Sequence, residues 1–523
     1  MTDHPLEPIF HPRGVAIVGV PSNQFGRGGG FLNAILAMGF DRNSVYPVNP
    51  KMTETSGLRC YPTLLDTPDP VDHVISQVPA HVVPELADQC IRKGVRSLHL
   101  YTAGFSETGD ARMVDMEREM VAKLRAAGVR AIGPNCMGLY VPASGLAFSN
   151  GFPTEPGNVC LISQSGANAS RIVGNLAARG VRFSKVISFG NGADLKAQDF
   201  FDYAASDPQT EIVIAYIEGV QGGRALLDAL KLCAAAKPTI ILKGGLSAAG
   251  ARAASSHTGS LAGSRQIFEA LCRQAGALRA ETLEDLLDLT IAVRTSVRRV
   301  AGRGVALIGG PGGYAVLSSD AIAAEGLDLP PMPESVIAQL REFIPVAGTS
   351  VNNPIDAFFR TPEEFDKGMR LVAGVDQIDV VFSTSFGAMP NVQADALESM
   401  SEEELAALAA KTAQTTVEML AQLQEETGVP FIVVQNDMDM GGGPGGGRRR
   451  PGGPGARRGA RSGPAVNAEP PNPFTLMASM GAAYQQSASE RGIAVFSDVR
   501  RAARTVHSLI EWRSRREGLP EIL

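Results

Sequence analysis

The stretch "GVAIVGV" (residues 14–20) has the composition of a short buried β-strand, and the glycine-rich segment "PSNQFGRGGG" (residues 21–30) follows it directly. The next residues, "FLNAILAMG" (residues 31–39), have the apolar spacing of an amphipathic helix. A strand that passes through a glycine turn into a helix is the first half of a βαβ unit. The same order recurs along most of the chain, which predicts parallel sheets covered by helices.

This repeated order predicts an α/β fold in three blocks, each a Rossmann-like or flavodoxin-like domain with a doubly wound parallel sheet. Residues 1–150 form the first block, residues 151–298 the second and residues 299–523 the third. A chain of 523 residues is too long for a single hydrophobic core, so about three domains are expected.

One segment of the third block has a different composition. Residues 438–472 consist mainly of Gly, Pro and Arg and contain few apolar side chains. This composition predicts a disordered surface insertion. Its six arginines would also suit an arm that binds nucleic acid. The chain as a whole has a net charge of −6, so we do not expect a nucleic-acid partner.

The overall composition is that of a cytoplasmic protein. The six cysteines are scattered and form no CxxC pair, which favours free thiols in a reducing compartment over disulfides or a metal site. The first residues, "MTDHPLEPIF", lack the basic and apolar regions of a signal peptide. No apolar run approaches the roughly 18 residues of a membrane span. We therefore expect no metal bound by this chain and no membrane association.

The end of the second strand indicates which ligand the first block binds. Sites for NAD usually place Asp or Glu there, to hold the ribose hydroxyls. Here the strand "VYPVNPK" (residues 45–51) ends in Asn49 and Lys51, and the glycine segment contains Arg27. The positive charges of Lys51 and Arg27 favour a phosphorylated nucleotide other than NAD. A nicotinamide cofactor, or glycines that serve only the geometry of the turn, are the alternatives.

A histidine lies in an unusual environment in the second block. His257 belongs to "SSHTGSLAGS" (residues 255–264), and 16 of the 21 residues in 244–264 are Ala, Gly or Ser. Small residues allow a backbone to approach a ligand closely, and an imidazole can act as a nucleophile or as an acid–base group. The alternative is a loop histidine with no chemical role.

Two polar turns follow strands of the second block. "SQSG" (residues 163–166) opens a helix, where free N–H groups and the helix dipole favour an anion. "GNGADL" (residues 190–195) offers a second turn of this kind. Ordinary helix caps are the alternative reading for both turns. The candidate phosphate-binding residues are Ser163, Ser165, Gly166, Asn191 and Gly192.

An ordered series of motifs across residues 12–289 resembles the CoA-binding and ligase domains of NDP-forming acyl-CoA synthetases and of the succinyl-CoA synthetase α subunit. The motifs are specific in combination, whereas no single one is decisive. They are "VYPVNPK" (45–51), "LYTAGFSETG" (100–109), "AIGPNCMG" (131–138), "LISQSGANAS" (161–170), "SFGNGADL" (188–195), "YIEGV" (216–220) and "LKGGLSAAGARAASSHTGSLAGS" (242–264).

The third block resembles the further α-side domain of the ADP-forming branch of this family. The similarity lies in "GGPGGYAVLSSDAIAAEGLDL" (309–329), "NNPIDA" (352–357) and "GIAVFSD" (492–498). Two features depart from the family pattern: the glycine segment 21–30 differs from the commoner forms, and the insertion has no recognised counterpart. No ATP-grasp domain is recognised in this chain.

The resemblance implies roles for individual residues. His257 would be the phosphohistidine that carries a phosphoryl group between two sites. Glu218, at the end of the strand "EIVIAYIEG" (211–219), would fix the tautomer of that histidine, although a solvated glutamate is the alternative. The buried-looking Cys136 is read as structural. The candidate CoA-binding residues are Gly19, Ser22, Asn23, Arg27, Lys51, Pro79, Thr102, Gly104 and Asn135.

The function implied is that of an α-type subunit of an NDP-forming acid–CoA ligase. It would form acyl-CoA from a carboxylic acid and CoA through an acyl phosphate. ATP or ADP, together with Mg²⁺, would bind to a separate ATP-grasp β-type subunit in a hetero-oligomer. The alternatives are a nucleotide-independent acyl or carbamoyl transferase and a regulatory CoA-binding subunit. The presence of both His257 and Glu218 argues against these alternatives, because neither needs a phosphate carrier.

Overall fold

The computed structural model describes residues 3–21, 30–252, 264–310, 312–357, 359–384, 400–435, 484–485 and 487–516. The predictions for Ser22, Asn23, Arg27, His257 and the insertion 438–472 fall outside these residues. The chain divides into two compact units, one of Met1–Val293 with Glu511–Leu523 and one of Arg294–Ile510. Within the described residues, no helix is both long enough and apolar enough to cross a membrane.

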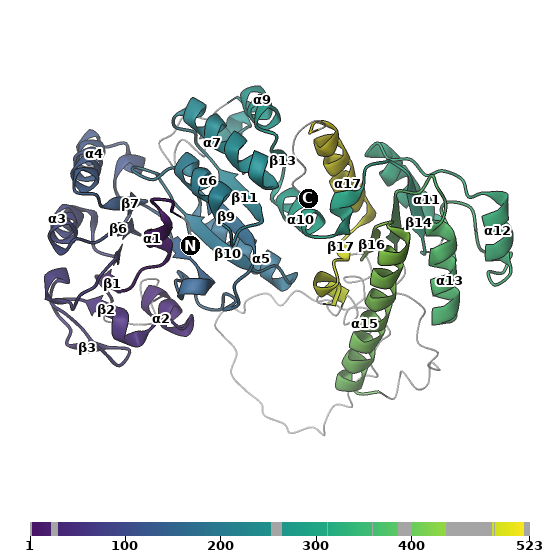
Figure 1. Cartoon of the computed structure of the whole chain (residues 1–523), viewed down its shortest axis with the longest axis horizontal. Coiled ribbons are helices and arrows are strands. Elements are labelled where there is room, and N and C mark those ends of the chain that lie inside the picture. Colours follow the sequence, from purple (N-terminus) through teal and green to yellow (C-terminus); the bar gives the residue numbers. More distant parts are fainter. Residues whose placement is uncertain are drawn as a thin grey trace, which may run out of the picture. The chain divides into compact units, whose positions relative to one another are not determined.

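The first unit begins with a five-stranded parallel sheet in the order β2-β1-β5-β6-β7 (Figure 1). This order is flavodoxin-like, and its direction reverses between β1 and β5. Every residue of β5 and β6 is buried, as expected for central strands covered on both faces. Its elements are α1 (Glu7–Phe10), β1 (Val15–Val18), α2 (Gly30–Ala37), β2 (Val45–Val48), β3 (Glu54–Thr55), β4 (Leu58–Arg59), β5 (His73–Ser76), α3 (Val83–Lys93), β6 (Ser97–Leu100), α4 (Ala111–Ala126) and β7 (Arg130–Ile132).

The same unit contains a six-stranded sheet in the order β13-β12-β11-β9-β10-β8, in which only β8 is antiparallel to its neighbour. Its parallel strands repeat the flavodoxin-like order, with the reversal between β9 and β11. Helices α6, α7 and α9 pack side by side on one face, and α5 covers the other (Figure 1). Its elements are β8 (Gly138–Tyr140), β9 (Val159–Ser163), α5 (Gly166–Ala178), β10 (Phe183–Ser188), α6 (Ala197–Ser206), β11 (Ile212–Ile217), α7 (Gly223–Ala236), β12 (Thr239–Lys243), α9 (Arg265–Ala275), β13 (Leu278–Ala280) and α10 (Leu283–Arg294).

The second unit is built on a four-stranded parallel sheet, in the order β14-β15-β16-β17. An isolated parallel bridge from Ile308 to Ile355 adds a contact on the outer side of β14. A second isolated parallel bridge joins Gly304, just before β14, to Asp328. The named strands follow a simple order, and these bridges beside β14 suggest the reversal of a doubly wound sheet. Its elements are β14 (Val305–Ile308), α11 (Gly312–Ala324), α12 (Glu334–Arg341), α13 (Pro362–Ala373), β15 (Val380–Ser383), α15 (Glu402–Thr427), β16 (Phe431–Val434), β17 (Ala494–Phe496) and α17 (Val499–Ser514).

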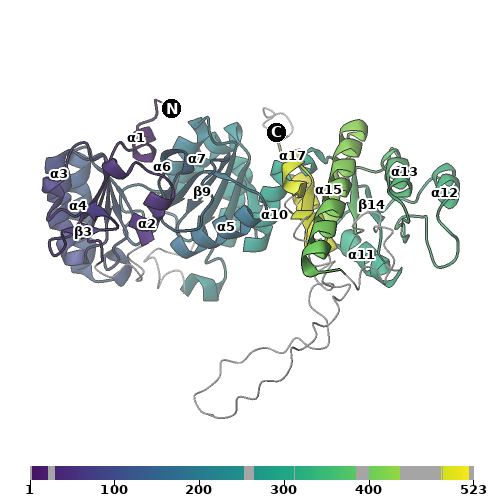
Figure 2. The same cartoon turned by 90° about the horizontal axis from the view of Figure 1, so that it is seen from below.

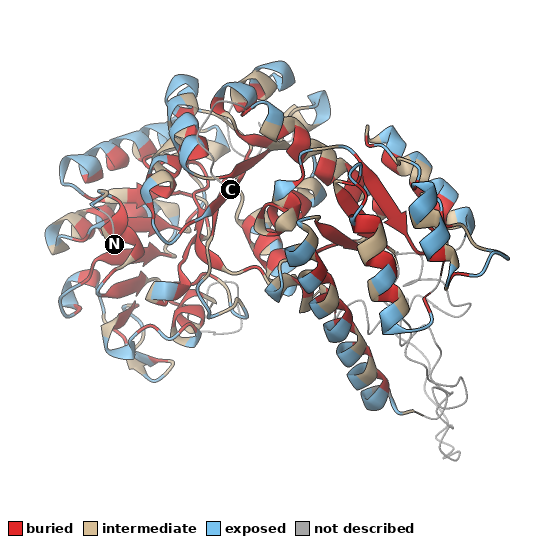
Figure 3. Cartoon of the chain, turned by 45° about the vertical axis from the view of Figure 1, so that its right-hand side comes forward, coloured by how far each residue is buried: buried red, intermediate tan, exposed pale blue. Residues whose placement is uncertain are grey.

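The predicted fold class is confirmed. The strands of the three larger sheets are almost entirely buried, and the helices expose their outer faces (Figure 3). Figure 2 shows the same strands and helices from below. This layering explains why the strand sequences are almost continuously apolar, whereas the helix sequences alternate between apolar and charged residues.

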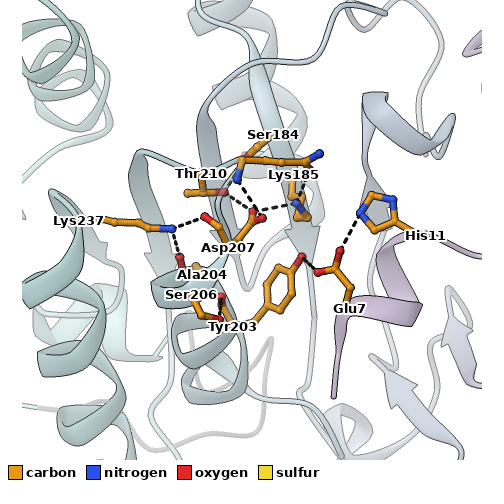
Figure 4. A network of polar contacts seen from close by, with 11 residues as sticks. Glu7, His11, Ser184, Lys185, Tyr203, Ala204, Ser206, Asp207, Thr210 and Lys237 are labelled. Carbon is orange, nitrogen blue, oxygen red and sulfur yellow. Dashed lines mark hydrogen bonds and ion pairs between the residues drawn. The ribbon is translucent and has the colours of Figure 1, made fainter. Parts of the chain in front are cut away.

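A buried polar network joins the N-terminal residues to the second sheet (Figure 4). The Tyr203 hydroxyl on α6 donates to Oε2 of Glu7 over 2.8 Å, and the Phe10 ring stacks on the Tyr203 ring at 4.4 Å. Beneath them, Nζ of Lys185 lies 2.8 Å from Oδ2 of Asp207, and both side chains are almost completely buried. The first residues of the chain are thus anchored to the second sheet.

Candidate active site

The point at which the first sheet reverses requires a glycine. Gly19 follows β1 with φ +89°, and a Cβ atom on it would lie 2.9 Å from Cγ1 of Val78, which follows β5. Nδ2 of Asn49 donates to the carbonyl oxygen of Val20 over 2.7 Å and ties the end of β2 to that of β1. Lys51 is exposed just beyond. Open α/β sheets bind ligands at this position, so the predicted Gly19 and Lys51 lie at a suitable edge.

A cavity of about 1080 Å³ lies where the carboxyl ends of the strands of the two sheets of the first unit meet. The first sheet contributes residues that follow β5 and β6, and the second contributes residues that follow β9 and β11. The reversal point of the second sheet therefore opens into the same space as the residues that follow β5 and β6 of the first. The predicted site residues that line it are Pro79, Thr102, Asn135, Ser165, Gly166, Asn191 and Glu218.

The turn at residues 133–138 forms one wall of the cavity and is held from two sides. Asn135 has φ +58°, and its N–H donates to the carbonyl oxygen of Thr102 over 2.9 Å. The buried His99 ring holds the Cys136 carbonyl oxygen at 3.1 Å from Nε2. Burial raises the pKa of the Cys136 thiol far above its usual value, so the thiol stays protonated. This environment supports the structural reading of Cys136.

The residues Thr102 and Gly104 shape the neighbouring wall. The Thr102 hydroxyl donates to the carbonyl oxygen of Val78 over 2.7 Å. Gly104 has φ +104°, and its N–H donates to the carboxylate of Glu107. The predicted Thr102 therefore contributes to the cavity wall, whereas the Gly104 amide is already satisfied within its own loop.

The N-terminus of α5 opens into the cavity. Ser165 caps this helix by accepting from the N–H of Asn168 over 3.3 Å. Gly166 is needed because a Cβ there would lie 2.4 Å from Cγ of Met137. The predicted Ser163 is instead fully buried, and its hydroxyl donates to the carbonyl oxygen of Ser165 over 2.7 Å. Ser163 thus shapes the turn, while the helix end presents Ser165 and Gly166 to the cavity.

The turn at residues 190–192 joins the two blocks. The N–H of Asn191 donates to the carbonyl oxygen of Pro134 over 3.0 Å, and that of Gly192 donates to the carbonyl oxygen of Phe189 over 3.2 Å. Nδ2 of Asn191 donates to Oε2 of Glu107 over 2.6 Å. These amides are engaged in contacts of the turn, and the phosphate-binding role of Asn191 and Gly192 stays a prediction.

Glu218 is held by three side chains. Oε1 of Gln164 accepts from the N–H groups of Glu218 and Gly219, over 2.8 Å and 2.9 Å. The Tyr216 hydroxyl donates to Oε1 of Glu218 over 3.0 Å. Nζ of Lys243 donates to the carbonyl oxygen of Glu218 over 2.7 Å, and burial lowers the pKa of this lysine. The carboxylate therefore has a fixed position at the cavity wall.

Sequence reasoning missed these supporting residues. Tyr216 lies near the end of β11, two positions before Glu218, which directly follows the strand, so the two side chains share one face of the sheet. That spacing is a signal that could have identified it. Gln164 follows β9 and Lys243 ends β12, but their contacts join different strands and require the folded sheet.

The small-residue segment that contains His257 begins beside this cavity. Gly245 and Gly250 line the cavity, and the described chain continues to Arg252 and begins again at Ser264. His257 lies between these ends, outside the described residues. Among the described residues, no group of three His, Cys, Asp or Glu side chains is arranged to hold a metal ion.

Three protein families match successive parts of the chain. Residues 13–142 match a family described as a CoA binding domain. Residues 156–293 match the succinyl-CoA ligase like flavodoxin domain, and residues 305–391 match the Ligase-CoA domain.

Individual relatives cover more of the chain. The α subunit of ADP-forming acetate–CoA ligase II of Pyrococcus furiosus is 33% identical over 459 residues, which is 84% of this chain and 99% of that protein. The chain belongs to the ADP-forming acetate–CoA ligase family. The ADP-forming acetate–CoA ligase I of Archaeoglobus fulgidus is 36% identical over 399 residues, which is 75% of this chain but only 56% of that longer protein. The chain therefore corresponds to the α-type part of the family.

A solved structure of the family agrees with the fold. It is titled as the dinucleotide forming acetyl-coenzyme A synthetase 1 of Ca. Korarchaeum cryptofilum, in complex with phosphate and ADP. It has a TM-score of 0.74 and 29% identity, and it covers 98% of each chain. The predicted relationship to ADP-forming acyl-CoA synthetases is confirmed by these comparisons, as is the presence of a CoA-binding domain.

Proposed function

We propose that this chain is the α-type subunit of an ADP-forming acid–CoA ligase, which makes acyl-CoA through an acyl phosphate. The observation that supports this most is the shared cavity. It places Pro79, Thr102 and Asn135 of the CoA-binding block opposite Ser165 and Glu218 of the ligase block. A thiol held by one block and a phosphoryl group held by the other would meet in this space.

The chemistry divides between named residues. A nitrogen of His257 receives a phosphoryl group and passes it to a carboxylate oxygen of the acid, which gives an acyl phosphate and restores neutral histidine. The sulfur of the CoA thiol then attacks the acyl carbon, phosphate leaves, and the thiol proton is released. The N-terminus of α5 stabilises the phosphate as it forms and leaves. Glu218 accepts a hydrogen bond from the second nitrogen of His257 and fixes its tautomer.

The remaining components are assigned to a second protein. Each of the described sheets belongs to a parallel α/β block, and the family names account for these blocks as CoA-binding and ligase domains. ATP or ADP, with Mg²⁺, would therefore bind to an ATP-grasp β-type subunit in a cytoplasmic hetero-oligomer. The α-subunit names of two relatives support a partner. The acid is a small carboxylic acid.

Phosphorylation of the chain tests this function. The purified complex of both subunits is mixed with ATP that carries ³²P on its γ-phosphate. We expect a label on this chain that is labile in acid and stable in alkali, as a phosphoramidate is and a phosphoserine is not. His257→Asn should abolish the label and the synthesis of acyl-CoA. Normal turnover in that variant would contradict the phosphohistidine mechanism and favour a nucleotide-independent transferase.

A further inference from the structure

The hydroxyl of Tyr216 makes a direct contact with the carboxylate of Glu218. Tyr216 lies near the end of β11, and its hydroxyl is 3.0 Å from Oε1 of Glu218. An ionised carboxylate can only accept hydrogen bonds, so the tyrosine is the donor. We propose that Tyr216 is a positioning residue for Glu218, which occupies Oε1 so that Oε2 is left for the histidine. This inference rests on the proposed function.

The Tyr216 hydroxyl leaves no room for a side chain at residue 244. A Cβ atom on Gly244 would lie 2.8 Å from the hydroxyl oxygen. Asn168, in the first turn of α5, lines the same cavity as Tyr216 and Glu218. The helix end that would hold phosphate and the carboxylate that would hold the histidine therefore face one space.

The charges around Glu218 determine which group donates this hydrogen bond. Among the described residues, two titratable groups face Glu218: Tyr216 on β11 and Lys243 on β12. The ammonium of Lys243 is engaged by the carbonyl oxygens of Glu218 and Gly244, over 2.7 Å and 3.0 Å. Burial and the nearby Glu218 charge both raise the pKa of Tyr216, so its proton stays in place. Tyr216 is therefore the donor, and Oε1 of Glu218 accepts.

Tyr216→Phe removes this hydrogen bond and keeps the ring. The carboxylate of Glu218 should then lose its fixed position, and the rate of histidine phosphorylation should fall about tenfold, as expected for the loss of one hydrogen bond. A residue that only packs against the strand would lower stability without changing this rate.

The test uses the full chain and acetyl [³²P]phosphate as the phosphoryl donor, since several relatives are acetate–CoA ligases. Initial labelling rates are measured from pH 5 to pH 9. Tyr140→Phe is the matched control, because the Tyr140 hydroxyl is also buried but donates to the carbonyl oxygen of Pro153 over 2.7 Å. We expect the labelling rate to fall only in Tyr216→Phe. An unchanged rate in that variant would overturn the proposal.

A second comparison guards against a general loss of structure. In the Glu218→Gln background the tyrosine has no carboxylate to position, so adding Tyr216→Phe should lower the labelling rate no further. An equal loss in both backgrounds would show that Tyr216 acts independently of Glu218 and would overturn the inference. A wild-type chain that takes up no label would instead contradict the proposed function, and this inference with it.

Discussion

Gly190 lies directly against the turn of the CoA-binding block. A Cβ atom on Gly190 would be 2.3 Å from the carbonyl oxygen of Pro134 and 2.5 Å from that of Asn135. Both oxygens belong to backbone that is already fixed by Thr102 and Asn191. The junction between the two sheets of the first unit therefore depends on the absence of a side chain at this position.

Gly190→Ala should destabilise the protein by about 1–3 kcal/mol, because both carbonyl groups belong to fixed backbone and that of Pro134 accepts from the N–H of Asn191. The free energy of unfolding in urea measures this loss. Gly174→Ala is the control, since a Cβ at this exposed position of α5 meets no atom within 4 Å. It should stabilise the helix by about 0.5–1 kcal/mol. Similar effects from the two substitutions would contradict the close approach at Gly190.

Asn191 and Glu107 should be strongly coupled. Asn191→Asp places a second carboxylate beside that of Glu107 and removes the donor that now lies 2.6 Å away. We expect a loss of about 1–3 kcal/mol in the free energy of unfolding at pH 7.5. Adding Glu107→Gln restores a donor and removes one charge, so the double variant should recover part of the loss. Strictly additive effects in this cycle would show that the contact contributes little.

The sequence pattern predicted the sheets well and the contacts of the polar turns less well. Strands such as β1 and β9 are apolar along their length, so composition alone identified them. The amides of Asn191 and Gly192 were expected to be free because the turn follows a strand. Their partners, Pro134 and Phe189, include a residue from another block, and such pairing depends on how the sheets meet.

Two buried histidines in the first sheet should make the protein sensitive to acid. Burial lowers the pKa of His73 to about 3 and that of His99 to about 4. Both values lie below the value of about 6.5 in the unfolded chain, so the unfolded state binds more protons below that pH. Above about pH 6.5, burying these neutral histidines does not reduce the free energy of unfolding. As the pH falls from about 6.5 toward their folded pKa values, the free energy of unfolding decreases.

At pH 5 this loss should be about 2 kcal/mol for each histidine. His99→Gln keeps an N–H donor for the carbonyl oxygen of Cys136 but cannot be protonated. The difference in unfolding free energy between pH 7.5 and pH 5 should therefore be about 2 kcal/mol smaller in this variant than in the wild type. An unchanged difference would mean that His99 titrates normally in the folded protein.

Lys51 should contribute to CoA affinity by contacting the 3′-phosphate on the ribose of CoA. It is exposed just after β2, and its N–H is held 2.9 Å from Oδ1 of Asn49, which also fixes the end of β1. In Rossmann-like folds, residues near the end of the second strand contact the ribose and any phosphate that it carries. Lys51→Ala should weaken CoA binding by about 1–3 kcal/mol, through the loss of a charge-assisted contact.

Calorimetry with 3′-dephospho-CoA should show a smaller loss, because that ligand lacks the ribose phosphate. Lys231→Ala, an exposed lysine on α7, should change neither affinity. An equal loss for both ligands would place Lys51 away from the ribose phosphate, and binding of NAD without CoA would contradict the assignment of the block.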